Sequence, residues 1–154
     1  MKRFKDNFKT RYYFAHEFLV VCPKCSSKAK VLPSVPWSSK RLFSTKRRLI
    51  CTHCGFYKEQ KPNRVIQMYG DRDWVFGLPL FYTICVKDGT LYAYNDEHLD
   101  YLKQFISAKL RTRDYSNSYS YSNRSQISRL PKWVKLAKNR NNLLKAIEKF
   151  EITI

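Results

Sequence analysis

The sequence predicts an α+β fold, in which an N-terminal antiparallel ribbon of three strands is joined to a β-hairpin and two or three packed α-helices. Three observations indicate this class. Two pairs of cysteines lie among short β-type segments, an Asp-Gly turn separates two β-branched and aromatic runs, and a helical repeat of apolar residues follows Asn95. We expect a ribbon module with an N-terminal arm over residues 1–64 and a hairpin and helical module over residues 65–154, packed together as one compact unit.

The first module opens with basic and aromatic residues at about helical spacing over residues 1–17, which predicts a short helix or an arm. Short segments of β type then flank the cysteine pairs. They are residues 18–21, 28–32, 42–50 and 56–59. We expect the last of them to close a three-stranded ribbon.

Four of the five cysteines form two CxxC pairs, Cys22 with Cys25 and Cys51 with Cys54. Two intervening residues let one tight turn present two thiolates to a tetrahedral Zn²⁺ ion. Gly55 suits such a turn because glycine tolerates a positive φ, and Ser26 holds the equivalent place after Cys25. We therefore predict one structural Zn²⁺ bound by the four cysteines.

Other readings of the cysteine pairs stay open at this point. The four cysteines could form two disulfides, one pair could be a redox motif, and His53 could compete as a metal ligand. The 25 residues between Cys25 and Cys51 exceed the roughly 15 to 20 of the common pattern. The hairpin that joins the two pairs should therefore be long.

The second module begins with a hairpin over residues 80–94, with Lys87-Asp88-Gly89 as its turn. A helix is predicted over residues 96–111, because Leu99, Leu102, Ile106 and Leu110 share one face. A Tyr/Ser/Asn-rich stretch over residues 115–128 predicts a loop. A second helix should open at Pro131 and could divide near Asn139, a weak helix former.

The motifs CPKC, CTHCG, LYAYN at residues 91–95 and AKNR at residues 137–140 carry a family resemblance. From about Leu19 onward, the chain resembles small bacterial proteins described as containing a zinc ribbon of the transcription factor IIB type. The resemblance implies a ribbon and a bound metal, and it implies no reaction mechanism.

The chain has a net charge of +18 over 154 residues, which predicts an acidic partner. Residues 1–64 carry 16 basic and 3 acidic side chains, whereas residues 65–114 carry 6 and 7. We expect nucleic-acid binding through a basic and aromatic hairpin tip that contacts the phosphate backbone. Its residues are Lys40, Arg41, Lys46, Arg47 and Arg48, with Trp37 and Phe43.

The alternative is a zinc-stabilised protein-interaction module, either an adaptor or an immunity-type protein that binds an acidic partner. We expect no enzymatic activity, because four thiolates leave no zinc position for an activated water. Asp71 with Asp73, His98 and Cys85 are weaker candidate sites, each of which is more often structural. The longest uncharged apolar run, residues 74–86, is too short to span a bilayer, so we expect a cytoplasmic protein without membrane contact.

Overall fold

The computed structural model describes residues 2–36, 45–61, 70–113 and 124–154. The chain divides into two compact units, each of which is built from more than one stretch of sequence. Unit 1 comprises Met1–Arg11, Ile84–Leu91 and Glu97–Ile154, and unit 2 comprises Tyr12–Thr83 and Tyr92–Asp96. The units thus divide the chain differently from the predicted modules 1–64 and 65–154. The described residues contain both helices and antiparallel strands, which confirms the coarse prediction of a mixed fold.

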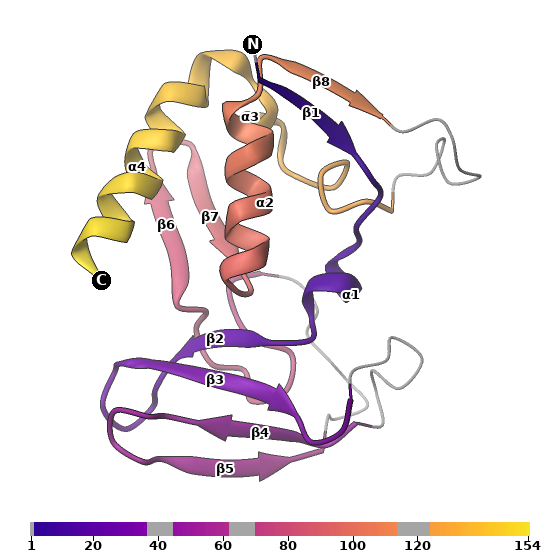
Figure 1. Cartoon of the computed structure of the whole chain (residues 1–154). Helices are drawn as coiled ribbons and strands as arrows, with labels where there is room; N and C mark the ends of the chain where they lie inside the picture. The colour runs from indigo at the N-terminus through magenta and orange to yellow at the C-terminus, as the bar shows by residue number, and fades with distance from the viewer. Residues whose placement is uncertain (1, 37–44, 62–69, 114–123) are drawn as a thin grey trace. The chain divides into compact units, whose positions relative to one another are not determined.

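Unit 2 contains a four-stranded antiparallel sheet in the order β2-β3-β4-β5 (Figure 1). Its strands are β2 Phe18–Val21, β3 Lys28–Pro33, β4 Arg47–Ile50 and β5 Tyr57–Gln60. The sequence predicted three strands, and this count is wrong. The apolar β2 pairs with β3 over its whole length, from Phe18 opposite Val31 to Val21 opposite Lys28, and so adds a fourth strand.

One face of this sheet is buried. Alternation along β3 places Ala29 and Val31 inside and Lys28 and Lys30 outside, as the period of a half-buried strand requires. Aromatic rings pack in the core of unit 2, where the Phe18 centroid lies 5.4 Å from that of Trp74 and 5.0 Å from that of Tyr94. The short helix α1, Arg11–Phe14, buries Phe14.

The hairpin formed by β6, Tyr82–Val86, and β7, Gly89–Ala93, contributes residues to both units. Its two-residue turn, Lys87 and Asp88, lies where the sequence predicted it, although Gly89 of the expected Asp-Gly pair is already the first residue of β7. Asn95 follows the hairpin in unit 2, and its buried side-chain amide donates to the carbonyls of Phe14 and Glu17 at 2.8 and 2.9 Å.

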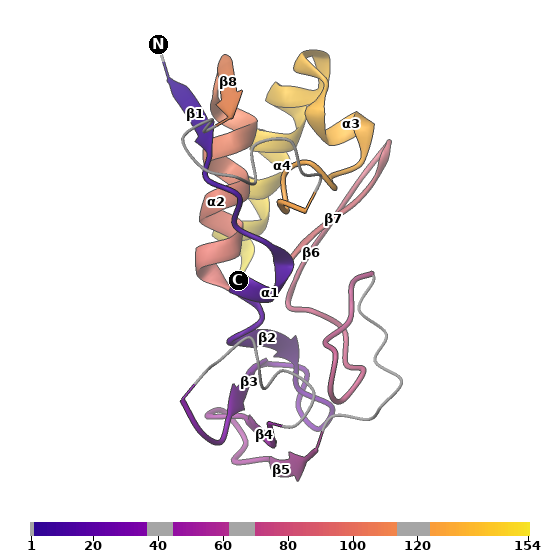
Figure 2. The same cartoon turned by 90° about the vertical axis from the view of Figure 1, so that its right-hand side faces the viewer.

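Unit 1 is built around helix α2, Asp96–Ser107. Figure 1 shows α2 between the β1–β8 pair and helix α4, and Figure 2 shows the same elements in the view turned by 90°. Phe4 of β1 lies edge-on to Phe105 at 5.4 Å, and Lys103 pairs with Glu151 of α4 at 2.9 Å. Strands β1, Arg3–Asp6, and β8, Leu110–Arg113, pair in parallel.

The predicted helix over residues 96–111 is too long, because α2 ends at Ser107. Leu110 and Arg111 instead lie in β8, where they are opposite Arg3 and Phe4 of β1. Leu110 is exposed rather than part of the apolar helix face. The helix still receives positive charge at its C-terminus, since the guanidinium groups of Arg111 and Arg140 donate to the carbonyl of Ile106.

The second predicted helix is divided, as its asparagines suggested. It consists of α3 Lys132–Lys135, the 3₁₀ turn η2 Ala137–Asn139 and α4 Arg140–Thr153. The break comes earlier than Asn139, at Leu136, which has an extended backbone. Asn139 donates from its side-chain amide to the carbonyl of Trp133 at 2.8 Å and so connects the pieces.

Among the described helices, none is both long enough and apolar enough to cross a lipid bilayer.

Candidate metal centre and basic face

The sheet topology brings the two cysteine turns to one end of unit 2. One turn connects β2 to β3, and the other connects β4 to β5. In an antiparallel meander, the first and third connections lie at the same end of the sheet. Because β3 and β4 are neighbours, the two turns lie side by side.

Both turns have the same backbone conformation. In the first, the N–H of Ser26 donates to the carbonyl of Cys22 at 2.9 Å, and in the second, the N–H of Gly55 donates to the carbonyl of Cys51 at 2.9 Å. Ser26 has φ +62° and Gly55 has φ +73°. Ser26 is therefore equivalent to Gly55 in the first turn, as the sequence predicted. Its left-handed backbone is less favourable than that of Gly55, because serine has a Cβ.

The four sulfur atoms form one compact group. All lie within 4.8 Å of one another, with 3.7 Å between Cys22 and Cys54 and 3.6 Å between Cys25 and Cys51. A tetrahedron with metal–sulfur bonds of about 2.3 Å has edges of roughly 3.8 Å, close to both distances. The four cysteines could therefore hold one metal ion. None of the five cysteines forms a disulfide, and His53 is exposed and outside the cluster.

Four thiolates this close together repel one another, and a cation between them would offset that repulsion. Hydrogen bonds from the backbone and side chain of Ser27 lower the pKa of Cys25 to about 5. The N–H of Phe56 lowers the pKa of Cys54, but burial and the other three cysteines together outweigh this hydrogen bond and raise the pKa to about 12. The fourth negative charge is thus disfavoured in the protein alone, and a metal ion at the centre would stabilise it.

Only three members of the predicted nucleic-acid patch fall within the described residues. Lys40, Arg41, Trp37 and Phe43 lie outside them. Lys46 is exposed, and its ammonium pairs with the carboxylate of Glu59 at 2.7 Å. That hydrogen bond raises the pKa of Lys46.

Arg47 does not belong to a surface patch, and this part of the prediction is wrong. Its side chain is 1% exposed and donates to the carbonyls of Ala15 at 2.8 Å and His16 at 3.4 Å. Its guanidinium carbon also lies 5.7 Å from the ring centroid of Phe18. Burial lowers its pKa to about 10, while Asp73 opposes the shift. Arg47 therefore satisfies backbone carbonyls inside unit 2.

The strand register places Arg48 of the predicted patch on a face with two lysines, Lys28 and Lys30, that the prediction did not include. Lys28, Lys30, Arg48 and Tyr57 share the outer face of the β2–β5 sheet, because Lys30 is opposite Ile50 and Ile50 is opposite Tyr57. Tyr57 is 55% exposed. We call these four residues the basic face. Alternation in residues 28–32 was visible in the sequence, but the pairing that aligns them with Arg48 and Tyr57 was not.

Among the weaker candidate residues, Asp73 and His98 have structural surroundings. The carboxylate of Asp73 accepts the N–H groups of Val75, Phe76 and Leu78 at 2.6 to 2.8 Å, so it holds a turn. His98 is fully buried in α2, and burial lowers its pKa to about 3. Cys85, in contrast, is exposed on β6, so the expectation that it is structural is wrong, and it is not a member of the four-cysteine group.

Comparisons of the chain with models of protein families, with curated proteins and with solved structures found no match. The resemblance to ribbon proteins of the transcription factor IIB type stays a prediction, and the function has to be inferred from the residues of this chain.

Proposed function

We propose that the four cysteines bind one Zn²⁺ ion with a structural role. Zn²⁺ favours tetrahedral thiolate ligands, and four protein ligands complete its coordination without a water molecule. The ion would join the β2–β3 turn to the β4–β5 turn in a small sheet. Iron is the competing metal for a tetrahedral site of four sulfurs. Metal analysis of the purified protein distinguishes the two.

We further propose that the zinc-stabilised sheet binds nucleic acid through the basic face. The observation that carries this proposal is the exposed Tyr57 ring on a face that also bears Lys28, Lys30 and Arg48. Cations neutralise phosphates and release counterions, and an exposed ring can stack on an unpaired base. The net charge of +18 favours the same class of partner.

All three cations have local partners that limit their contribution. Arg48 is opposite Glu59 in the β4–β5 register. Lys30 lies 3.6 Å from the carboxylate of Glu17, and the Lys28 ammonium lies 5.5 Å from the ring centroid of Phe81. Such exposed interactions contribute up to about 1 kcal/mol, so a phosphate can replace them. A metal-held sheet would keep the cations at fixed spacing along a strand of nucleic acid.

The test is the salt dependence of binding to single-stranded and duplex oligonucleotides. Each phosphate contact contributes about 0.9 to the log-log slope on duplex DNA and about 0.7 on single strands. Changing Lys28, Lys30 and Arg48 together to Ala should weaken binding and flatten the slope by about 3 on duplex DNA and about 2 on single strands. Tyr57→Ala should weaken single-strand binding by about 1 to 3 kcal/mol and leave the slope unchanged.

The matched control changes Lys132, Lys145 and Lys149 of unit 1 to Ala, which removes the same charge from exposed positions. It should affect binding much less than the basic-face variant. If the two variants weakened oligonucleotide binding equally, binding would depend on the net charge of the protein and not on the basic face. No binding even at low salt would reject the proposal and favour the alternative partner, an acidic protein.

A further inference from the structure

Unit 1 contains a cavity of about 460 Å³ that the proposed function does not use. Residues of β1, α2, β8, α3 and the turn before α3 line it, and Figure 1 draws β1 in indigo and β8 and this turn in orange. Its size falls within the roughly 300 to 1,000 Å³ of small-molecule sites. The lining residues are Phe4, Asp6, Phe105, Arg111, Thr112, Ile127, Ser128 and Lys135.

Two cations lie in the wall. The Arg111 guanidinium is stacked on Phe105, with its central carbon 4.1 Å from the ring centroid. It donates to the carbonyls of Phe105 at 3.1 Å, Lys135 at 2.6 Å and Ile106 at 3.4 Å. A guanidinium has five N–H groups, so these bonds leave about two for a ligand. Lys135 is held by its bond to the carbonyl of Ser128 at 2.7 Å.

Positive charge gathers around Arg111, because Arg140 donates to the same carbonyl, that of Ile106. Burial first, and then the charge of Arg140, lowers the pKa of Arg111. An anion beside Arg111 would relieve both effects.

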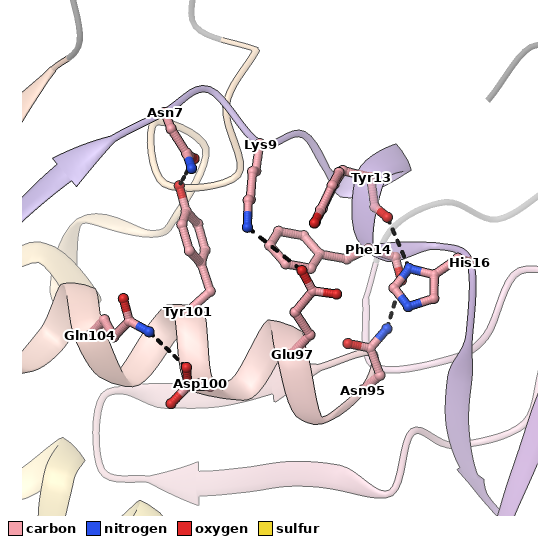
Figure 3. Close-up of polar contacts among 10 residues, drawn as sticks. All are labelled: Asn7, Lys9, Tyr13, Phe14, His16, Asn95, Glu97, Asp100, Tyr101 and Gln104. Atoms are coloured by element: carbon pink, nitrogen blue, oxygen red, sulfur yellow. Dashed lines mark hydrogen bonds and ion pairs between the residues drawn. The ribbon is translucent and has the colours of Figure 1, made fainter. Parts of the chain in front are cut away.

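Asp6, the last residue of β1, supplies a hydrogen-bond acceptor in the wall of the cavity. It is buried, and it accepts hydrogen bonds from the N–H of Phe8 at 3.0 Å, the hydroxyl of Tyr101 at 3.3 Å and the hydroxyl of Ser125 at 2.7 Å. Tyr101 is also bonded to Asn7, as Figure 3 shows, so its hydroxyl is fixed from two sides. A carboxylate offers about four acceptor sites, so one remains for a donor on a ligand.

From these contacts, we propose that the cavity binds a small organic anion with an aromatic body. Its acidic group, a carboxylate or a phosphate, pairs with Arg111 and Lys135. Its ring packs against Phe4, Phe105 and Ile127, and a hydrogen-bond donor on the ring faces Asp6. The lining residues carry two positive charges and one negative charge, so the net charge of the wall is positive and favours an anion.

The test uses NMR titration of the full-length, metal-loaded, ¹⁵N-labelled protein. The acidic probes are 4-aminobenzoate and guanosine 5′-monophosphate, and 4-aminobenzamide and guanosine are their neutral counterparts. At least one acidic probe should shift the amides of Thr112, Ser128 and Lys135 in a saturable way. Its neutral counterpart should bind about tenfold more weakly, which corresponds to about 1.4 kcal/mol. The acidic probe that binds shows whether the acidic group of the ligand is a carboxylate or a phosphate.

Lys135→Gln should weaken binding of the acidic probe by about threefold to tenfold. The substitution removes a positive charge near the ligand but keeps a hydrogen-bond donor for the carbonyl of Ser128. Lys132→Gln is the matched control on the same short helix, because Lys132 is exposed and does not line the cavity. The probe comparison needs no variant and so tests the proposal even if Lys135→Gln misfolds. The proposal is overturned if no probe shifts these amides at millimolar concentration, if acidic and neutral probes bind equally, or if the two lysine variants behave alike.

Discussion

His98 and Arg47 are polar side chains that occupy interior positions, and each has a consequence at the scale of the single residue. His98 is fully buried in α2, and its pKa is lowered to about 3 from 6.5 by desolvation. Arg47 is equally enclosed in unit 2, where it donates to the carbonyls of Ala15 and His16. His98 makes the free energy of unfolding depend on pH. Arg47 is buried, so its charge is not available to a partner at the surface.

We predict that His98 reduces stability as the solution becomes acidic. In the unfolded chain, His98 gains a proton near pH 6.5, whereas in the folded chain it does so only near pH 3. Between these values the unfolded state binds more protons, so the free energy of unfolding falls as the pH falls. The loss is up to about 1.4 kcal/mol for each pH unit, and it is absent above pH 6.5.

Urea unfolding of the wild type and of His98→Gln from pH 7.5 down to about 5 measures this slope. The variant has no imidazole, so its stability should depend less steeply on pH. His16→Gln is the control, because it removes an imidazole from a half-buried position instead of a fully buried one. Parallel curves for the wild type and His98→Gln would contradict the prediction.

Arg47 also shows what a single sequence could not reveal about the candidate site. The ligand cysteines were predictable, because their spacing is local and their chemistry is specific. The run Lys46-Arg47-Arg48 looked like one exposed cationic stretch. Which of its members is buried depends on the sheet face and on acceptors at Ala15 and His16, which lie far away in the sequence.

At the scale of elements, local patterns predicted strands, turns and helix starts better than helix ends. The hairpin and the start of α2 agree with the sequence, because Asp-Gly turns and apolar repeats are local signals. The end of α2 does not. Leu110 continues the helical spacing, but pairing with Arg3 of β1 draws it into β8, and no local pattern contains that partner.

The hairpin turn gives a prediction about packing. A Cβ built on Gly89 would lie 2.8 to 3.0 Å from three ring atoms of Trp133, closer than real side chains approach. Gly89→Ala should therefore lower the free energy of unfolding by about 1 to 3 kcal/mol, through overpacking against the indole. Thermal or urea unfolding measures the effect.

Asp88→Ala serves as the control in the same turn, since Asp88 is exposed. A second arm combines Gly89→Ala with Trp133→Leu, which removes the ring that causes the clash. If overpacking is the cause, the double variant should lose less stability than the sum of the single variants. Additive losses would point to the backbone of the turn instead.

At the scale of the whole molecule, the metal site belongs to one unit only. All four cluster cysteines lie within Tyr12–Thr83 of unit 2, whereas Cys85 belongs to unit 1. The proposed Zn²⁺ ion connects β2, β3, β4 and β5, and small sheets of this size depend on such a connection because they bury little apolar surface. The charged residues proposed to bind nucleic acid lie on the same sheet.

Removal of the metal should therefore act on the two units unequally. On addition of a zinc chelator, amide groups of β2 to β5 should lose protection from hydrogen exchange before those of α2 and α4, because only the sheet loses a cross-link. Cys51→Ser should reproduce this pattern without chelator and bind less than one equivalent of metal, since three thiolates remain. Cys85→Ser, which removes a cysteine outside the cluster, should leave both the metal content and the exchange pattern unchanged. Simultaneous loss of protection in α2, α4 and the sheet would contradict a stabilising role confined to unit 2, and full metal content in Cys51→Ser would contradict the four-cysteine site.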